Sequence, residues 1–354
     1  MSKLHAQFDR ILIIKLRHHG DVLLITPVIN TLKDNYPEVE IDVLLYKETE
    51  PILADFSSVD NLFSIDRQWK KQGTKAHLGH EWRLLRRLRY RQYDLVINLA
   101  DQWYSAFVAR FTGAKVRIGF DLVKRRSLFW KKCFTNLVPT EHSRFLHIVE
   151  QNLSALSLLN LPLINTKVTM SYCKEDKEIV LALLGKHGVN QKYIVVQPTS
   201  RWLFKCWDEK KMSETISALQ SDGWVIVVTS GPDRKEEEMV EKILANCPKE
   251  RVVSFAGQLT LPQLAVLIEG ANLFIGMDSV AMHMAAALKT PAIALFGPSK
   301  LVFWRPWEAK GEVIWAGDYG DLPDPDDVDT KTDIRYLNVI PSDMVIAAAR
   351  RNLL

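Results

Sequence analysis

The sequence predicts an α/β protein of two doubly wound parallel-sheet domains that face each other across a cleft. Its 354 residues exceed what one hydrophobic core typically organises. Short unbroken apolar runs alternate with longer helical patterns, which is typical of parallel sheets covered by helices on both faces. This alternation occurs twice, with the segment 159–171 between the two series, so we expect one sheet on each side of that segment.

The strands of the first domain are predicted at 11–16, 41–46, 62–65, 94–100 and 116–120. Those of the second are predicted at 193–198, 224–231, 252–255, 273–278, 292–297 and 313–316. We therefore expect an N-terminal domain over 1–165 and a second domain over 172–338. The apolar stripe after Pro341 predicts a terminal helix within 339–354, which we expect to pack back on the N-terminal domain.

Cysteine spacing and hydropathy indicate the compartment. The four cysteines are isolated in the sequence, which fits a reducing environment and gives no zinc or disulfide framework. No run of about 18 apolar residues occurs, and the first ten residues contain no apolar segment of the kind found in signal peptides. We expect a cytoplasmic protein that is at most peripheral to a membrane.

Several common catalytic motifs are absent. No GxGxxG, GxxxxGK[ST], GxSxG or HExxH pattern occurs, which weakens a dinucleotide dehydrogenase, P-loop, serine hydrolase or zincin interpretation. Asp324 and Asp326 spell DxD, but they lie in an acidic loop and not after a buried strand, so we expect no metal there. The remaining candidates follow strand ends, where open α/β sheets bind ligands.

The first candidate is the turn after strand 11–16, which reads Arg17, His18, His19, Gly20 and Asp21. Glycine permits a tight turn and close approach of a ligand. Asp21 is either the N-cap of the following helix or a general base that projects into the cleft. The local sequence favours neither.

The second candidate is the loop after strand 193–198, where Thr199 and Ser200 precede Arg201 and Lys205. Hydroxyls and backbone N–H groups beside two cations suit a phosphate, because charge-assisted hydrogen bonds are strong. The alternative is a solvated loop before the helix that begins near Asp208.

The third candidate follows strand 273–278, which ends at Asp278. Ser279 is placed to cap a helix that carries His283, and a helix N-terminus attracts phosphate. A lone histidine there is otherwise a buried structural residue. A more specific pattern arises when three features occur together: Asp-Ser, a histidine five residues after the aspartate, and an alanine-rich helix. This combination is more specific than a lone histidine or a helix N-terminus by itself.

These three motifs, in this order and spacing over nearly the whole chain, resemble the bacterial heptosyltransferases of glycosyltransferase family 9. The resemblance implies the two-domain GT-B fold and an inverting transfer that needs no metal and no cofactor. It implies ADP-L-glycero-D-manno-heptose as donor and the inner core of lipopolysaccharide as acceptor, at a core heptose. The rivals are another GT-B transferase or epimerase, and a non-catalytic nucleotide- or nucleic-acid-binding protein.

The resemblance assigns roles residue by residue. The catalytic base falls on Asp21, and the main-chain contact to adenine falls near Leu259. The donor diphosphate falls to Thr199, Ser200, Lys205, Asp278, Ser279 and His283. The family often has glycine where this chain has Val280. Its ribose-binding acid falls among Asp233, Glu236 and Glu237, of which we choose Glu236.

The stretch 67–91 carries nine Lys or Arg and one acid, Glu81. It is either a solvated helix face or a site for nucleic acid, since aromatic residues interleave with the cations. The family resemblance adds a third interpretation, in which Arg86 and Arg87 join Arg17 and His18 in holding an anionic acceptor. The partners we then expect are the donor, the core lipid and an anionic membrane at the inner face of the bacterial inner membrane, without nucleic acid.

Overall fold

The computed structural model describes residues 7–125, 127–190 and 192–354. Residues 1–6, where the sequence shows no apolar segment, lie outside the described residues. The chain divides into two compact units, the first ending at Ser171 and the second spanning Tyr172–Leu354. In the part described, no helix is both long and apolar enough to cross a membrane.

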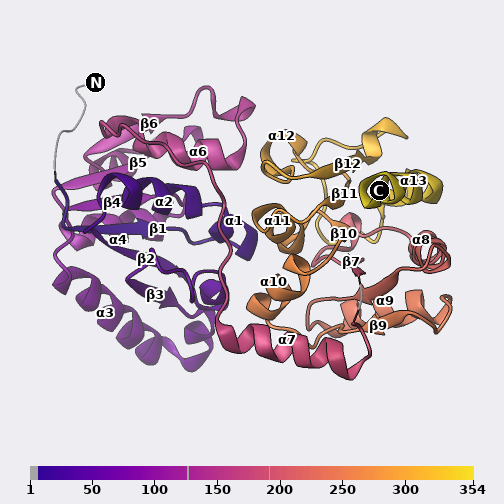
Figure 1. The fold of residues 1–354 in the computed structure, drawn as a ribbon. Coiled ribbons are helices and arrows are strands. Elements are labelled where there is room, and N and C mark those ends of the chain that lie inside the picture. Colours follow the sequence, from indigo (N-terminus) through magenta and orange to yellow (C-terminus); the bar gives the residue numbers. More distant parts are fainter. Residues whose placement is uncertain (1–6, 126, 191) are drawn as a thin grey trace. The chain divides into compact units, whose positions relative to one another are not determined.

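The first unit is built on a six-stranded parallel sheet (Figure 1), with the order β3-β2-β1-β4-β5-β6. Its strands are β1 Arg10–Ile14, β2 Glu40–Tyr46, β3 Asn61–Ile65, β4 Leu95–Asn98, β5 Val116–Asp121 and β6 Asn136–Pro139. The chain leaves β1 toward β2 and β3 on one side and returns to β4 on the other. This reversal is the topological switch point of a doubly wound sheet, and it lies between β1 and β4.

Helices cover both faces of this sheet because its central strands are apolar on both sides. Buried residues of α3, α4 and α5 form one core against it, and α2 packs with α6. The helices are α1 His19–Leu23, α2 Thr26–Asn35, α3 Thr74–Tyr90, α4 Trp103–Thr112, α5 Leu128–Cys133 and α6 Ile148–Ser154. The 3₁₀ turns are η1 Lys47–Ile52, η2 Arg67–Gln72, η3 Val123–Arg125, η4 Ser143–Phe145 and η5 Ala155–Leu158.

The second unit repeats the plan, with six parallel strands in the order β12-β11-β10-β7-β8-β9. They are β7 Tyr193–Gln197, β8 Val225–Val228, β9 Val252–Ser254, β10 Leu273–Met277, β11 Ala292–Phe296 and β12 Gly311–Trp315. The switch point here lies between β7 and β10, which pair directly. The prediction of two doubly wound α/β domains is thus confirmed.

Two groups of helices flank the second sheet. Buried residues of α8, α9 and α13 share one core, whereas α10 packs with α7 and α11. The helices are α7 Lys174–Lys186, α8 Glu209–Ser221, α9 Arg234–Ala245, α10 Leu261–Glu269, α11 Val280–Ala287, α12 Leu301–Trp304 and α13 Ser342–Leu353. The 3₁₀ turns are η6 Leu203–Lys205, η7 Ala316–Asp318 and η8 Tyr336–Val339.

The C-terminal helix packs within the second unit, where α13 contacts α8, β10, β11 and β12. Its apolar stripe of Val345, Ala348 and Ala349 is fully buried in the second core. The small alanines let the helix approach α8 closely. That the helix packs back on the N-terminal domain stays a prediction.

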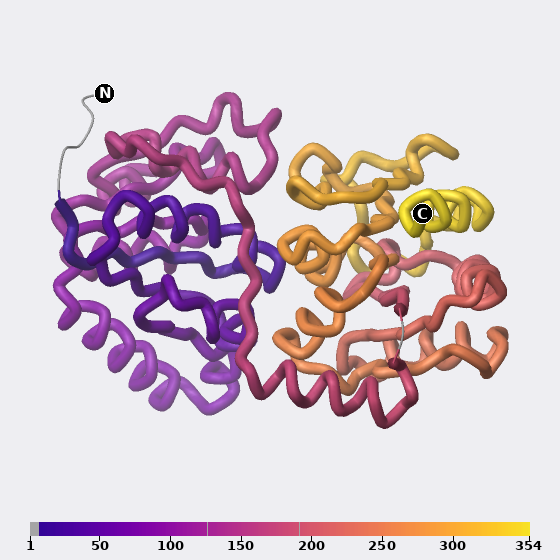
Figure 2. The backbone as a smooth tube through the Cα atoms, viewed as in Figure 1, coloured from indigo at the N-terminus to yellow at the C-terminus, as the bar shows by residue number. Residues whose placement is uncertain are grey.

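The segment 159–171, expected as a linker, lies along α2 and belongs to the first unit. Figure 2 follows it from α6 to α7. Asn30 Nδ2 donates to the Lys167 carbonyl at 3.0 Å, and the Thr169 amide donates to Thr26 Oγ1 at 2.9 Å. These hydrogen bonds pair backbone groups of the extended segment with side chains of α2, so they hold the segment against that helix.

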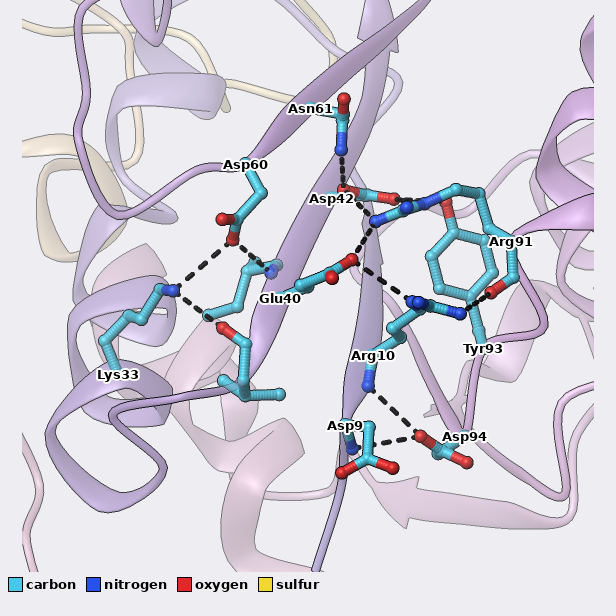
Figure 3. Close-up of polar contacts among 12 residues, drawn as sticks. Asp9, Arg10, Lys33, Glu40, Asp42, Asp60, Asn61, Arg91, Tyr93 and Asp94 are labelled. Atoms are coloured by element: carbon cyan, nitrogen blue, oxygen red, sulfur yellow. Dashed lines mark hydrogen bonds and ion pairs between the residues drawn. The ribbon is translucent and has the colours of Figure 1, made fainter.

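A charged network closes the amino-terminal edge of the first sheet (Figure 3). Asp42, which is fully buried, accepts hydrogen bonds from Arg91 Nε at 2.8 Å, the Tyr93 hydroxyl at 2.7 Å and Asn61 Nδ2 at 2.9 Å. Arg91 also reaches Glu40. Each buried group here has a partner, so the network fixes the end of α3 to the start of β2.

Candidate active site

Each unit gathers polar side chains at the carboxyl edge of its sheet, beside the switch point. In the first unit they follow β1 and β4, which are paired neighbours. In the second they follow β7, β8, β10 and β11. Open α/β sheets bind ligands at this edge. At the switch point the loops after the two neighbouring strands run in opposite directions, which leaves a crevice between them.

Asp21 follows β1 and does not cap its own helix. The N-cap of α1 is His18, and no side chain makes a capping hydrogen bond there. The Asp21 carboxylate instead lies 3.9 Å from Lys15 Nζ, and 15% of its side chain is exposed. Asp21 is therefore not the N-cap residue of α1, and its role as a general base stays a prediction.

Lys15 and Asn152 were missed by the sequence analysis. Lys15 is buried, and its Nζ donates to Asn152 Oδ1 at 3.3 Å. Asn152, from α6, donates in turn to the Leu24 carbonyl at 3.1 Å. Burial lowers the pKa of Lys15, while Asp21 opposes that shift. The available signal was a single lysine within an otherwise apolar strand, and such a buried cation needs a partner.

The ends of β1 and β4 are joined by ion pairing. Arg17 Nη2 contacts Asp101 Oδ2 at 3.0 Å, and Gln102 Nε2 donates to the Leu16 carbonyl at 2.8 Å. Arg125 Nε donates to the Asp101 carbonyl at 2.7 Å. Arg17 and His18 thus lie beside Asp21 at this edge, together with Asp101, which the sequence analysis had not singled out.

Arg86 and Arg87 lie elsewhere in the first unit. The helix that carries them, α3, ends toward the amino edge of the sheet, because Arg91 directly after it contacts the start of β2. The Arg87 guanidinium lies 5.0 Å from the ring of Phe63 on the edge strand β3. The structure therefore does not bring these two arginines together with Asp21 at the end of β1.

In the second unit, the half-buried Lys205 forms an ion pair with the buried Asp278 at the switch point. Lys205 Nζ lies 2.5 Å from Asp278 Oδ2, and the Ser299 hydroxyl donates to the same oxygen at 2.7 Å. η6 delivers the lysine after β7, and the other two residues follow β10 and β11. A positive charge is thereby fixed at the carboxyl edge, as an anion site requires.

The start of α11 adds further polar groups to this edge. Ser279 occupies the N-cap position without a side-chain capping bond, and its buried Oγ makes no hydrogen bond to any described residue. His283 is buried one turn later, with its ring 6.4 Å from that of Trp304. A helix N-terminus with an uncommitted hydroxyl suits a phosphate oxygen.

Glu236 contacts the residues that follow β7 and β8. Its Oε2 accepts from the Thr199 hydroxyl at 2.6 Å and from the Gly231 amide at 3.0 Å. A Cβ at Gly231 would lie 3.0 Å from this carboxylate, so a larger residue there would make the carboxylate shift by a few tenths of an ångström. Asp233 instead caps α9 through the Lys235 amide at 2.9 Å. Among the competing acids, Glu236 is the one bonded to Thr199.

Ser200 and Leu259 complete the residues selected from sequence. Ser200 follows Thr199 and is half-buried. Leu259, also half-buried, lies in the loop between β9 and α10, and this loop bonds to the one after β8 through the Gly257 amide and the Ser230 carbonyl at 3.4 Å. Both residues thus follow strands of the sheet that carries Lys205.

The DxD-like loop contacts Lys300, the residue after Ser299. Asp326 Oδ2 pairs with Lys300 Nζ at 2.5 Å, and both side chains are exposed. Asp324 accepts from the Asp326 amide at 2.8 Å, which is a local turn bond. The chemistry of this loop is that of a solvated turn.

Comparison with known proteins shows the family of the chain. Residues 81–334 match the family model of glycosyltransferase family 9 (heptosyltransferase). The chain is 43% identical over 338 residues to lipopolysaccharide heptosyltransferase 3 of Escherichia coli, covering 96% of this chain and 97% of the relative.

Solved structures share the fold. The glycosyl transferase family 9 protein of Veillonella parvula superposes with a TM-score of 0.83 at 21% identity, covering 98% of this chain and 97% of that one. The E. coli ADP-heptose LPS heptosyltransferase II gives 0.77 at 22% identity, covering 97% and 98%. E. coli heptosyltransferase WaaC with ADP-2-deoxy-2-fluoro heptose gives 0.75 at 20% identity, covering 97% and 99%. The expected GT-B fold is confirmed.

Proposed function

This chain belongs to glycosyltransferase family 9, and from that premise we propose that it transfers L-glycero-D-manno-heptose from ADP-heptose to a heptose of the lipopolysaccharide inner core. The observation that carries the proposal is the cluster of Lys205, Asp278, Thr199 and Glu236 at one sheet edge. It offers a cation and hydroxyls for a diphosphate beside a carboxylate for a ribose. The 43% identity to lipopolysaccharide heptosyltransferase 3 supports this acceptor class.

The proposed transfer inverts the anomeric centre. The oxygen of an acceptor hydroxyl forms a bond to the anomeric carbon, while the bond from that carbon to the β-phosphate oxygen breaks on the opposite side. Asp21 takes the hydroxyl proton, and ADP keeps the bonding electron pair. A positioned base contributes about 10²- to 10⁴-fold in rate. Asp21 suits this role because its side chain is partly exposed and does not cap α1.

The second unit stabilises the leaving ADP. Negative charge grows on the β-phosphate as the bond breaks, and Lys205 supplies a positive charge held in place by Asp278. The Ser279 hydroxyl and the amides that start α11 add donors. We propose that this charge makes a divalent metal unnecessary. Glu236 binds the ribose, and the Leu259 main chain binds adenine.

In the first unit, Arg17 and His18 stand beside Asp21 and are the proposed contacts for an acceptor that carries acidic groups. Arg86 and Arg87 are left out of this contact because α3 carries them away from β1. An enzyme that modifies a core lipid works at the inner face of the inner membrane, so we propose a cytoplasmic, peripheral location.

The deciding experiment is transfer from ADP-heptose to defined truncated cores, with the new linkage and its anomeric configuration read by NMR. We expect one heptose added to a core heptose, with inverted configuration and one ADP released for each transfer. Release of ADP that does not depend on the core, or transfer from a different nucleotide sugar only, would assign the chain to another GT-B activity. Saturable nucleotide binding without any transfer would assign it to a binding protein.

A further inference from the structure

Five aromatic rings form a row across three helices of the first unit. Trp82 of α3 lies 6.0 Å from Phe111 of α4, and Phe111 lies 5.9 Å from Phe107. Trp103, one turn before Phe107 on α4, lies 5.8 Å from Phe129 of α5. We call these five residues the aromatic row. Its two contacting groups, Trp82–Phe111–Phe107 and Trp103–Phe129, are linked through α4, where Trp103 and Phe107 lie four residues apart and therefore on the same face of the helix.

Four of the five rings of the aromatic row are exposed, and Phe111 is half-buried. Trp82 is 54% exposed, Phe129 50%, Trp103 42% and Phe107 41%. Leu78 lies one turn before Trp82 on α3, and Leu128 lies beside Phe129 on α5, and both are more exposed still. Single exposed apolar side chains are ordinary on a soluble protein, but a contiguous set of this kind indicates a surface that something covers.

Cations border the aromatic row. Arg86 follows Trp82 by one turn on α3, and the Arg125 guanidinium lies 5.1 Å from the Trp103 ring. Exposed basic side chains also stand at the end of α4 and on α5, namely Arg110, Lys131 and Lys132. The stretch 103–133 carries eight Lys or Arg and one acid, Asp121. The partner of this surface therefore carries negative charge beside apolar material.

We propose that the aromatic row and its bordering cations are the surface by which this protein docks on an anionic lipid bilayer. Tryptophan, with an apolar ring and a polar N–H, settles at the boundary between headgroups and acyl chains, and phenylalanine and leucine beside it supply apolar surface that enters the acyl region. Lysine and arginine beside them reach the headgroup phosphates while their methylenes stay on the apolar side. This proposal rests on the proposed function in one respect. An enzyme that modifies a core lipid works at a membrane, and for this reason we name a lipid bilayer as the partner.

Two other occupants fit the surface less well. Nucleic acid stacks its bases on free ring faces, whereas these rings pack against one another at 69°, 39° and 52°, and the neighbouring leucines offer no stacking face. A second copy in a twofold interface would place the same basic border against itself. Like charges that face each other oppose such a dimer.

The test is flotation of the full chain with vesicles of phosphatidylcholine alone and of phosphatidylcholine with phosphatidylglycerol. We expect flotation with the anionic vesicles. Phe107→Ser combined with Phe129→Ser lowers the partition coefficient by at least about tenfold. Lys131→Gln combined with Lys132→Gln lowers it by about fivefold for each lysine removed, and this loss disappears at high salt. The matched control, Ile179→Ser with Leu181→Ser, changes exposed side chains of α7 and floats like the wild type.

Wild-type protein that stays unbound with anionic vesicles overturns the proposal, as do both double variants floating like the wild type. A wild-type dimer that Phe107→Ser with Phe129→Ser converts to a monomer would assign the surface to a second copy instead. Binding of single-stranded DNA in place of vesicles would assign it to nucleic acid. Heptose transfer to a water-soluble core oligosaccharide measures the proposed activity without a membrane. We expect both double variants to retain this transfer activity.

Discussion

Lys15 Nζ lies 3.9 Å from Asp21 Oδ1, and the lysine is buried while the carboxylate is partly exposed. A buried cation costs free energy, which a partner and hydrogen bonds offset only in part. Asn152 holds the same ammonium at 3.3 Å, so the lysine has one fixed position beneath the carboxylate. This ion pair fixes the neighbourhood of the carboxylate that we propose as the base.

The first prediction concerns Asp21→Asn. The amide keeps the shape of the carboxylate but accepts no proton, so we expect turnover to fall by about 10²- to 10⁴-fold. ADP affinity stays unchanged, because the proposed donor residues belong to the second unit. Steady-state transfer and calorimetric ADP binding read the two effects. Asp34→Asn, on the exposed face of α2, is the matched control, and turnover near normal in Asp21→Asn would remove the base from the mechanism.

The second prediction separates stability from activity at Lys15. Burial lowers the pKa of this lysine, so its charged form is less favourable in the folded chain than in the unfolded one. Lys15→Met keeps the apolar stem and removes the charge, so we expect the free energy of unfolding to stay equal or rise while turnover falls about tenfold. The gain in stability is largest below the folded pKa of Lys15 and shrinks as pH rises through it. Urea unfolding of the wild type and Lys15→Met across alkaline pH measures the difference in the free energy of unfolding. A variant that is less stable than the wild type would contradict the prediction.

The third prediction concerns Lys205 and Asp278. Hydrogen bonds to a charged group contribute about 1.5–3 kcal/mol, so Lys205→Met weakens ADP binding by about 10- to 100-fold. Asp278→Asn releases the ammonium from its position and weakens binding less. The double variant costs less than the sum of the two, because the residues contact each other at 2.5 Å. Isothermal titration of the four proteins measures the coupling, and strict additivity would show that the pair does not act on ADP as a unit.

The fourth prediction tests the choice of Glu236 for the ribose. If its carboxylate accepts from a ribose hydroxyl, the wild type binds ADP more tightly than 2′-deoxy-ADP, and Glu236→Gln reduces that preference by about tenfold. Thr199→Val removes the 2.6 Å bond that orients the carboxylate and produces a smaller reduction. Glu237→Gln is the control, one residue along the same helix. A preference that Glu237→Gln loses and Glu236→Gln keeps would reverse the assignment.

The strands were predictable because parallel strands buried on both faces are continuous apolar runs. All eleven predicted runs are strands in the structure, and β6 was missed because Asn136–Pro139 is short, half-buried and ends in proline. The burial of the α13 stripe in the second core was not predictable, because Val345, Ala348 and Ala349 show which face is apolar but not which elements cover it.

The position of polar residues at the sheet edge was predictable where one strand end supplies them all, as with Asp278 and Ser279. Pairs from distant segments were not predictable. Thr199 and Glu236 are 37 residues apart, and they meet only because β7 pairs with β8 in a particular register. Lys15 was visible as a charge within an apolar strand, but its two partners come from α1 and α6, which no local pattern relates to β1.

The last prediction is a pH dependence of stability in the second unit. Arg335, just before η8, forms two hydrogen bonds to Glu209 at the start of α8, one of them 2.8 Å long. These bonds lower the pKa of Glu209, because they favour its charged form. A depressed carboxylate pKa contributes stability that is complete above the unfolded value of about 4.3 and is lost as pH falls through the folded pKa.

Glu209→Gln should therefore lower the free energy of unfolding by about 1–2 kcal/mol at neutral pH, since a neutral amide replaces a charge-assisted pair. The difference from wild type disappears at pH values below the folded pKa, where the wild-type carboxyl is also neutral. Urea unfolding between pH 3 and 7, read by circular dichroism, measures it, with Glu214→Gln on the exposed part of α8 as the control. A difference that stays constant over this range would show that the charge of Glu209 does not stabilise the second unit.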